Sequence, residues 1–100
     1  MVKKFDVFFC EIHGATRPCV VLSPNEMNDF LPYVLVAPIT TLKRAFPCRM
    51  GVKLKGQAGQ VALDLIRSIP KAHLTERIGS LPSPSQEEIV KLLKELFCTN

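Results

Sequence analysis

The sequence lacks the short motifs that mark several large classes of nucleotide-binding and hydrolytic enzymes. It contains no GxxxxGK[ST] phosphate loop, no GxGxxG dinucleotide turn, no HExxH metal motif and no GxSxG nucleophile turn. Its four cysteines, Cys10, Cys19, Cys48 and Cys98, form no CxxC pair and show no tight metal-ligand spacing. We therefore expect no metal, no cofactor, and reduced thiols in a cytoplasmic protein.

Long apolar runs are also missing. No segment approaches the roughly 20 apolar residues of a membrane span. The start, MVKKFDVFF, does not read as a signal peptide, because Asp6, Glu11 and His13 interrupt any apolar stretch. We therefore expect no contact with a membrane.

Chain length and net charge indicate the number of domains and the class of binding partner. One hundred residues, of which 47% are hydrophobic and 22% charged, predict one domain, 1–100, with a buried core. The net charge of +4 favours a polyanionic partner, either nucleic acid or an acidic protein segment. An ordinary basic surface would explain the same charge.

Alternation and β-branched or aromatic residues predict a series of short strands. They cover 5–12, 17–23, 33–40, 48–55 and 61–69, the last closed by Pro70 and followed by a helical turn and a short strand within 71–81. The HGAT turn joins the first two strands into an antiparallel hairpin, and GQAGQ reads as a turn. Pro38 predicts that the third strand lies at an edge or carries a bulge.

Two helices are expected. Asn25 is predicted to cap one short turn that ends before Pro32. Over 83–97, Ser83 and Gln86 match a capping box, Pro84 suits the first helical position, and a row of apolar residues repeats at helical spacing. That row comprises Ile89, Leu92, Leu93, Leu96 and Phe97. The fold class is therefore mainly β, a curved SH3-like antiparallel sheet or barrel with a C-terminal amphipathic helix.

Four polar clusters are the candidates for carrying a function. They are Arg17 before Pro18, the pair Thr40 and Thr41, the pair Lys43 and Arg44 in a basic loop, and Asp64 with Arg67. Each has an ordinary explanation: strand-end or loop charges for solubility, a β-forming threonine, and an Asp64 that pairs with Arg67 or caps a turn.

Several stretches carry a family resemblance. TRPCVVLS, YVLVAPITT, FPCRMGVKL, VALDLIRSI and RIGSLPSPSQEEI resemble, in order and spacing, the MazF/PemK (Kid) family of toxin endoribonucleases, over roughly residues 4–96. The resemblance implies a homodimer that cleaves single-stranded RNA at short sequences without metal. It also implies a cognate antitoxin whose acidic, largely disordered C-terminal tail covers the active surface.

The resemblance assigns roles to particular residues. Arg17 matches the arginine at the scissile phosphate, Thr40 its partner threonine, and Asp64 an acidic position implicated as a base. Thr41, Lys43, Arg44 and Arg67 are expected to contact RNA.

Metal-free cleavage through the 2′-hydroxyl needs a proton acceptor, a proton donor and groups that stabilise developing negative charge. The products are a 2′,3′-cyclic phosphate and a 5′-hydroxyl end. Arginine presents a fork of donors to phosphate but is a reluctant proton shuttle, so we expect Arg17 to act electrostatically. Asp64 is one candidate base, and His13 and Glu11 are others.

The sequence departs from the family pattern in two places. Relatives carry a longer GxEQxG element before the arginine, where this chain has only EIHGAT, and Leu65 replaces a usual glutamine. Two other functions stay open: a CcdB-like gyrase inhibitor of the same fold, and a non-catalytic SH3-like RNA-binding module.

Overall fold

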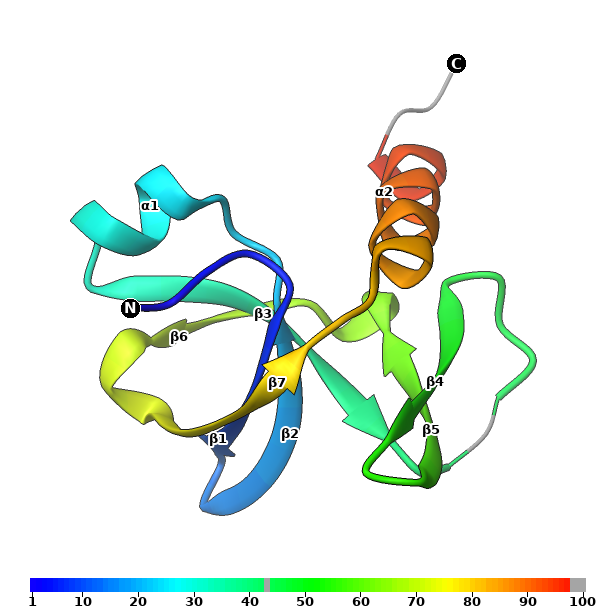
Figure 1. Cartoon of the computed structure of the whole chain (residues 1–100), viewed down its shortest axis with the longest axis horizontal. Coiled ribbons are helices and arrows are strands. Elements are labelled where there is room, and N and C mark those ends of the chain that lie inside the picture. The colour runs from blue at the N-terminus through cyan, green and yellow to red at the C-terminus, as the bar shows by residue number, and fades with distance from the viewer. Residues whose placement is uncertain (43, 98–100) are drawn as a thin grey trace.

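The computed structural model describes residues 1–42 and 44–97 (Figure 1). Its elements are β1 (Asp6–Ile12), β2 (Ala15–Val21), α1 (Asn25–Phe30), β3 (Tyr33–Thr40), β4 (Arg49–Leu54), β5 (Gln57–Ala62), the 3₁₀ turn η1 (Leu63–Leu65), β6 (Arg67–Pro70), the 3₁₀ turn η2 (Lys71–His73), β7 (Leu74–Ser80) and α2 (Ser83–Phe97). The predicted fold class is confirmed: one curled antiparallel sheet with a C-terminal helix. Lys43 and Cys98 lie outside the described residues.

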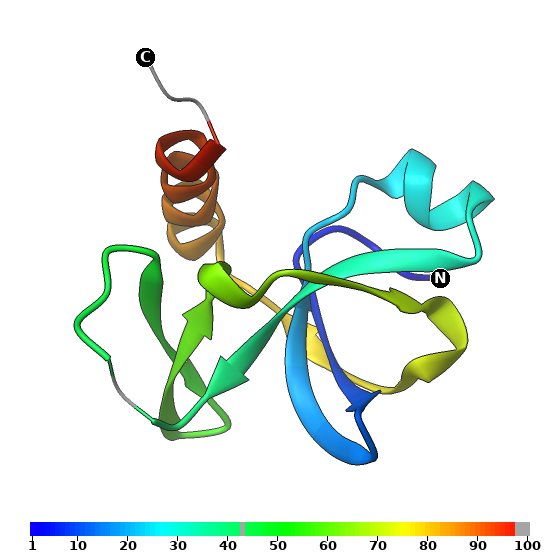
Figure 2. The same cartoon turned by 180° about the vertical axis from the view of Figure 1, so that it is seen from behind.

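The sheet has seven strands in these described residues, in the order β4-β5-β3-β2-β1-β7, with β6 paired to β3. In Figures 1 and 2, β1, β2, β6 and β7 curl together on one side of the molecule, and the β4–β5 hairpin stands on the other beneath α2. β3 runs through both halves: Tyr33–Val36 pair with β6, and Ile39 and Thr40 pair with β5.

Two apolar clusters lie on opposite faces of β1, β2 and β3, because successive strand residues point to opposite faces. One includes Cys10, Cys19 and Val36, which are fully buried inside the curled half. The other includes Val20, Leu63 and Ile89, and the last of these anchors α2 onto the sheet. The prediction that 17–23 is buried on both faces is thus confirmed at Cys19 to Leu22.

Pro38 does not place β3 at an edge, so that part of the prediction is wrong. Its Cα partner is Cys19 of β2. On the other side of β3, Ala37 and Pro38 lie between the residues that pair with β6 and those that pair with β5. A residue without an N–H fits there because neither neighbour requires its hydrogen bond.

Two strand predictions need correction. The expected GQAGQ turn is mostly strand β5, and the turn itself is Lys55 and Gly56, with φ of 50° and 80°. The expected strand 61–69 is broken by η1 into the end of β5 and the start of β6. The break adds one strand to the five strands and one short strand expected, which gives seven among the described residues.

The predicted caps are also wrong. Pro24, not Asn25, precedes α1, and the Asn25 Oδ1 instead accepts a hydrogen bond from the Lys4 amide at 2.8 Å. At α2, the Gln86 amide bonds the Pro82 carbonyl and its side chain donates to the Leu81 carbonyl. The helix has the predicted bounds, 83–97, but Ser83 is its first residue and not its cap, and the capping box does not form.

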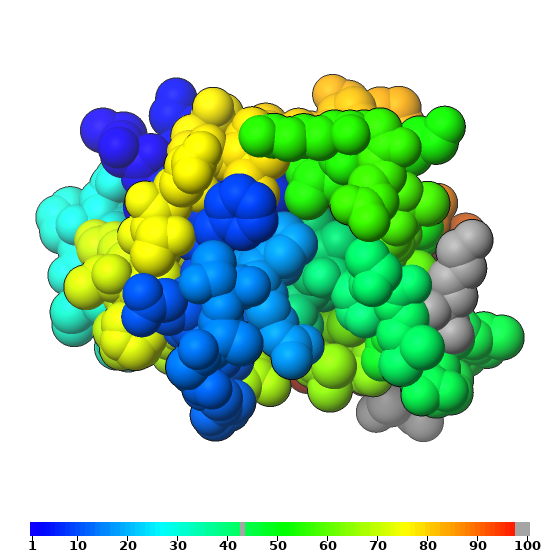
Figure 3. All heavy atoms as spheres, turned by 90° about the horizontal axis from the view of Figure 1, so that it is seen from below, coloured from blue at the N-terminus to red at the C-terminus, as the bar shows by residue number. Residues whose placement is uncertain are grey.

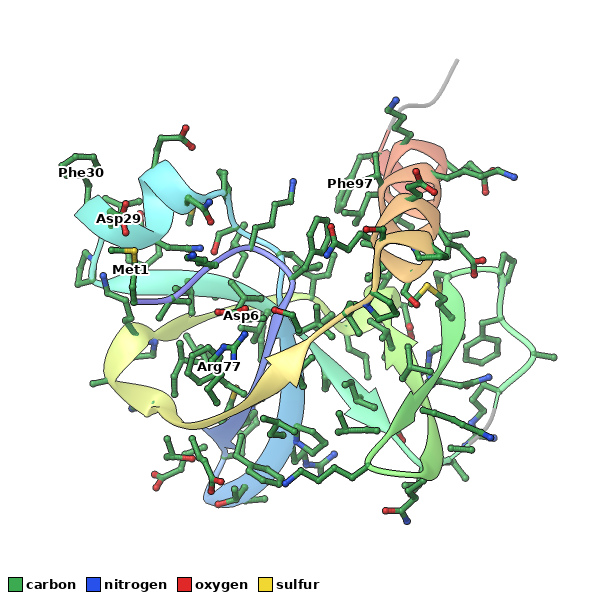
Figure 4. The ribbon with its side chains drawn as sticks, in the orientation of Figure 1. Met1, Asp6, Asp29, Phe30, Arg77 and Phe97 are labelled. Carbon is green, nitrogen blue, oxygen red and sulfur yellow. The ribbon has the colours of Figure 1, made fainter. Side chains whose placement is uncertain are left out.

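The apolar face of α2 is only partly buried. Ile89 is fully covered, and Leu92 and Leu93 pack against the core beside it. Leu96 is 38% exposed and Phe97 69% exposed, and Figure 4 shows Phe97 at the end of the helix far from the sheet. The last turn thus extends beyond the sheet that the earlier turns cover. Among the described residues, no helix is long and apolar enough to cross a membrane.

Candidate RNA-binding and cleavage site

Arg17 lies in β2, opposite Cys10 of β1, and the next residue, Pro18, lies opposite Phe9. Proline restricts the residue before it to extended backbone, so Arg17 has a rigid base within the strand. The side chain is exposed. The sequence predicted that this strand begins at Arg17, but β2 begins two residues earlier, at Ala15, because Ala15 and Thr16 also pair with β1.

Arg17 and Thr40 line the same surface groove, which has a volume of about 380 Å³. Its lining residues are Phe9, Arg17, Pro18, Ile39, Thr40, Thr41, Leu54, Lys55, Gln57 and Ile78. Figure 3 shows this face, with the blue side chains of the β1–β2 hairpin beside the green ones of the β4–β5 hairpin. The lining includes two cations and no carboxylate, so the groove favours an anion.

Thr40 is held in a defined orientation. Its Oγ1 accepts a hydrogen bond from the Leu42 amide at 3.1 Å. Because the oxygen acts as acceptor in this bond, the hydroxyl hydrogen stays available to donate to another group. From the neighbouring strand, a Cβ placed on Gly59 would lie 3.0 Å from Ile39 Cγ2 and 3.2 Å from the Thr40 carbonyl. Gly59 therefore permits the close approach of β5 to the end of β3.

The basic loop after β3 is attached to β5 by a side chain that the sequence analysis missed. Gln60 Oε1 accepts from the Arg44 amide at 2.9 Å, and Gln60 Nε2 donates to the Arg44 carbonyl at 3.1 Å. Gln60 is also the cross-strand partner of Thr40. No local pattern signals this contact, since it joins residues 16 positions apart. The sequence analysis also did not predict that Lys55 and Gln57 line the groove. The pair Lys55-Gly56 has the composition of a hairpin turn, which could have indicated the turn but not the groove.

A second, smaller cavity also has Arg17 in its lining and has a volume of about 170 Å³. It is lined by Ile12, His13, Ala15, Arg17, Pro38, Leu65 and Arg67. His13 and Gly14 form the two-residue turn between β1 and β2, both with positive φ (50° and 78°). The structure thus brings His13 and Arg67 together with Arg17. Glu11 is exposed opposite Thr16 and lines neither cavity.

Asp64 does not pair with Arg67, which corrects one of the readings left open by the sequence. Both carboxylate oxygens accept hydrogen bonds from Arg49, at 2.6 and 3.0 Å. The hydrogen bond from Arg49 lowers the pKa of Asp64 below its usual 3.8, against the opposing effect of partial burial. Asp64 lines neither of the two cavities beside Arg17.

The arrangement suits a polyanion with a reactive phosphate. A guanidinium, a hydroxyl and the Lys55 ammonium share the larger groove, and neither cavity beside Arg17 has a carboxylate in its lining. The carboxylate of Asp64 is paired with Arg49. Within the described residues, no group of three or more His, Cys, Asp or Glu side chains is placed to hold a metal ion.

Comparison with known proteins agrees with this geometry. The family model for a "PemK-like, MazF-like toxin of type II toxin-antitoxin system" matches residues 3–97. The protein Endoribonuclease EndoA of Bacillus subtilis (strain 168) is 27% identical over 94% of this chain and 92% of its own length.

Solved structures show the same fold. A mycobacterial endoribonuclease in complex with its cognate antitoxin matches with a TM-score of 0.91 and 20% identity, covering 100% of this chain and 98% of that one. A MazE-MazF structure from Deinococcus radiodurans matches with a TM-score of 0.85 and 22% identity, covering 99% and 97%.

Proposed function

The chain belongs to the family of PemK-like, MazF-like toxins of type II toxin-antitoxin systems, and from this premise we propose that it is an endoribonuclease that cleaves single-stranded RNA without a metal ion. The observation that carries the proposal is that Arg17 and Thr40, from different strands, line one groove that has no carboxylate in its lining. The curated relative at 27% identity is named as an endoribonuclease, which supports the same activity.

In the proposed reaction the 2′-hydroxyl next to the scissile phosphate loses its proton and its oxygen bonds to phosphorus. The bond from phosphorus to the 5′-oxygen breaks, and that oxygen takes up a proton. Arg17 donates to the phosphate oxygens through its planar fork, and Thr40 donates its free hydroxyl hydrogen to the same group. The products are a 2′,3′-cyclic phosphate and a 5′-hydroxyl end.

The proton acceptor in the proposal is His13. It lines the cavity that Arg17 shares, and histidine is the side chain most often used for proton transfer near neutral pH. Asp64, the acceptor suggested by the family resemblance, has both oxygens engaged by Arg49 and a lowered pKa, which weakens it as a base.

The test is cleavage of RNA by the purified protein in EDTA, with mapping of the product ends. Removing one donor to a developing oxyanion typically lowers the rate about 10²- to 10³-fold, and we expect a loss of that size for Arg17→Ala. Arg17→Lys keeps the charge but not the fork, so it should restore only part of the rate.

Paired substitutions test the hydroxyl. Thr40→Val keeps the shape and removes the donor, whereas Thr40→Ser keeps the donor. Lys91→Ala, which removes one exposed charge from α2, serves as the control. Intact RNA with the unmodified protein, or full activity in Arg17→Ala, would contradict the proposal.

We also propose that the protein is a homodimer inhibited by a cognate antitoxin with an acidic tail. The solved relatives from Mycobacterium and Deinococcus are described as toxin–antitoxin complexes. An acidic segment would fit the cationic lining of the groove by charge. Light scattering should give about twice the chain mass of 11.2 kDa, and a monomeric mass at micromolar concentration contradicts the dimer.

A further inference from the structure

Gln60 of β5 holds the loop between β3 and β4 by two hydrogen bonds to one residue. Its Oε1 accepts from the Arg44 amide at 2.9 Å, and its Nε2 donates to the Arg44 carbonyl at 3.1 Å. The side-chain amide thus uses both its acceptor and its donor group on the backbone of Arg44. Two bonds to one residue fix the direction of the loop as well as its distance from β5.

The same loop is also held by Thr40, the residue from which it leaves β3. Thr40 Oγ1 accepts a hydrogen bond from the Leu42 amide at 3.1 Å. Thr40 is the cross-strand partner of Gln60, so both attachments of the loop come from one pair of facing residues. Arg44 follows Leu42 by only two positions. A displacement of the loop at Arg44 therefore also displaces the Leu42 amide.

Gln60 itself lies outside the site. It lines neither the larger groove nor the smaller cavity that includes Arg17. Thr40 and Thr41, where the loop begins, both line the groove. An effect of Gln60 on a phosphate in the groove must therefore pass through the loop.

The two hydrogen bonds of Gln60 contribute little to the stability of the fold. They lie at an exposed part of the surface, where water competes for each donor and acceptor and the net gain of a hydrogen bond is small. Ordering a glutamine side chain costs rotamer entropy of comparable size. Because gain and cost largely offset each other, the main consequence of the two bonds is the placement of the loop.

We infer that Gln60 is a positioning residue for cleavage, which keeps the Leu42 amide on Thr40 Oγ1 and so holds the Thr40 hydroxyl in one orientation. The inference rests on the proposed function, in which Thr40 donates to the scissile phosphate. With the Leu42 bond in place, the position of Oγ1 is set and its hydrogen is free to donate. Without that bond, Thr40 samples its other staggered rotamers, and the hydroxyl is directed at the phosphate for only part of the time.

The first experiment measures cleavage by Gln60→Met, which keeps an unbranched side chain of similar length and removes both hydrogen bonds. Because three staggered rotamers are then open to Thr40, we expect kcat to fall about three- to tenfold. KM should stay within about twofold, since Arg17 and Lys55 still line the groove. The midpoint of urea unfolding should stay close to that of the unmodified protein. Lys91→Ala should change none of these values.

A double variant separates positioning from general damage to the fold. Thr40→Val has no hydroxyl for Gln60 to orient, so adding Gln60→Met to it should lower the single-turnover cleavage rate by less than about twofold. If Gln60 acted by a route that does not involve Thr40, the two losses would multiply. A further loss of about three- to tenfold in the Thr40→Val background therefore overturns the inference.

Hydrogen exchange tests the link between Gln60 and Thr40 without RNA. Loss of an ordinary hydrogen bond corresponds to about two- to tenfold faster exchange. In Gln60→Met we expect a change of that size at the Arg44 amide, which has lost its acceptor, and also at the Leu42 amide, whose acceptor is Thr40. The amides of β1 and β2 should exchange at unchanged rates. Unchanged exchange at Leu42 contradicts the link.

The outcomes separate this inference from the proposed function. If the unmodified protein cleaves RNA but Gln60→Met keeps its kcat and its Leu42 exchange, the positioning role is wrong and the proposed function stands. If RNA stays intact with the unmodified protein, the proposed function is wrong and the role of Gln60 in cleavage fails with it. Faster exchange at Leu42 would in that case still support the link from Gln60 to Thr40.

Discussion

At the scale of single residues, the contacts of Asp64 and His13 lead to opposite expectations for catalysis. Asp64 binds Arg49 through both oxygens, whereas His13 lines a cavity with Arg17. We expect Asp64→Asn to keep the single-turnover cleavage rate within about tenfold. His13→Ala should lose the 10²- to 10⁴-fold that a general base typically contributes. The reverse order of the two losses would assign the base to Asp64.

Gly59 and Gly51 form a matched pair on neighbouring strands. A methyl group on Gly59 would meet Ile39 and the Thr40 carbonyl at 3.0 and 3.2 Å, whereas one on Gly51 meets nothing within 4 Å. Gly59→Ala should destabilise the protein by about 1–3 kcal/mol and also lower cleavage, because Thr40 must shift. Gly51→Ala should change neither. Urea unfolding and cleavage rates measure both effects, and equal behaviour of the two variants contradicts the argument.

At the scale of elements, a buried carboxylate joins the start of β1 to the end of β7. Asp6 accepts hydrogen bonds from Ser80 Oγ at 2.7 Å, Arg77 Nη2 at 3.3 Å and the Lys3 amide at 3.1 Å. Figure 4 shows Asp6 and Arg77 pointing toward one another between these strands. Burial alone would raise the pKa of Asp6, but the hydrogen bonds from Ser80 and Arg77 outweigh it and lower the pKa below 3.8.

Because the pKa of Asp6 is lower in the folded protein than in the unfolded chain, its carboxylate stabilises the folded state at pH values above the unfolded pKa. The difference in free energy of unfolding between wild type and Asp6→Asn should therefore be constant from neutral pH down to about pH 5. The difference should shrink as the pH falls through 3.8, the pKa of Asp6 in the unfolded chain, and then through the lower pKa that Asp6 has in the folded protein. Urea unfolding at a series of pH values measures the difference. A gap that widens on acidification contradicts the assignment.

Elements with a strong local pattern were predictable from the sequence, and those defined by distant contacts were not. The strand Tyr33–Thr40 matches its predicted bounds because β-branched residues fill it and prolines flank or interrupt it. The strand over Gln57–Ala62 was missed because its small and polar residues carry no strand signal. It forms by pairing with β4 on one side and the end of β3 on the other.

The candidate site follows the same division. Arg17 and Thr40 were predicted together from two motifs, and the structure places both in one groove. The partner of Asp64 was not predictable, because Arg49 lies 15 positions away in the chain. Arg67, only three positions away, was the partner that local spacing suggested. Gln60 and Gly59 owe their roles to the side-by-side packing of β5 and β3.

At the scale of the whole molecule, β3 joins two apolar cores into one cooperative unit. Ile69 belongs to the core of the curled half and Leu63 to the core beneath α2. Ile69→Ala and Leu63→Ala should each destabilise the whole protein by about 2–5 kcal/mol. Far-UV circular dichroism and the fluorescence of Tyr33, the single tyrosine, should report one coincident transition in both variants. Separate midpoints for the two signals would mean that the halves unfold independently.

The two tight hairpin turns have a consequence for how such a toxin can diversify. His13-Gly14 adjoins the small cavity and Lys55-Gly56 adjoins the large groove. Exposed hairpin tips tolerate insertions and replacements far better than the strands they join. Variation at the Lys55-Gly56 tip can therefore reshape one end of the larger groove, whereas His13, the proposed proton acceptor, restricts variation at the other tip. In the proposed mechanism Arg17 and Thr40 stay fixed on strands that both cores hold in place, so cleavage preferences can change at one tip without rebuilding the chemistry.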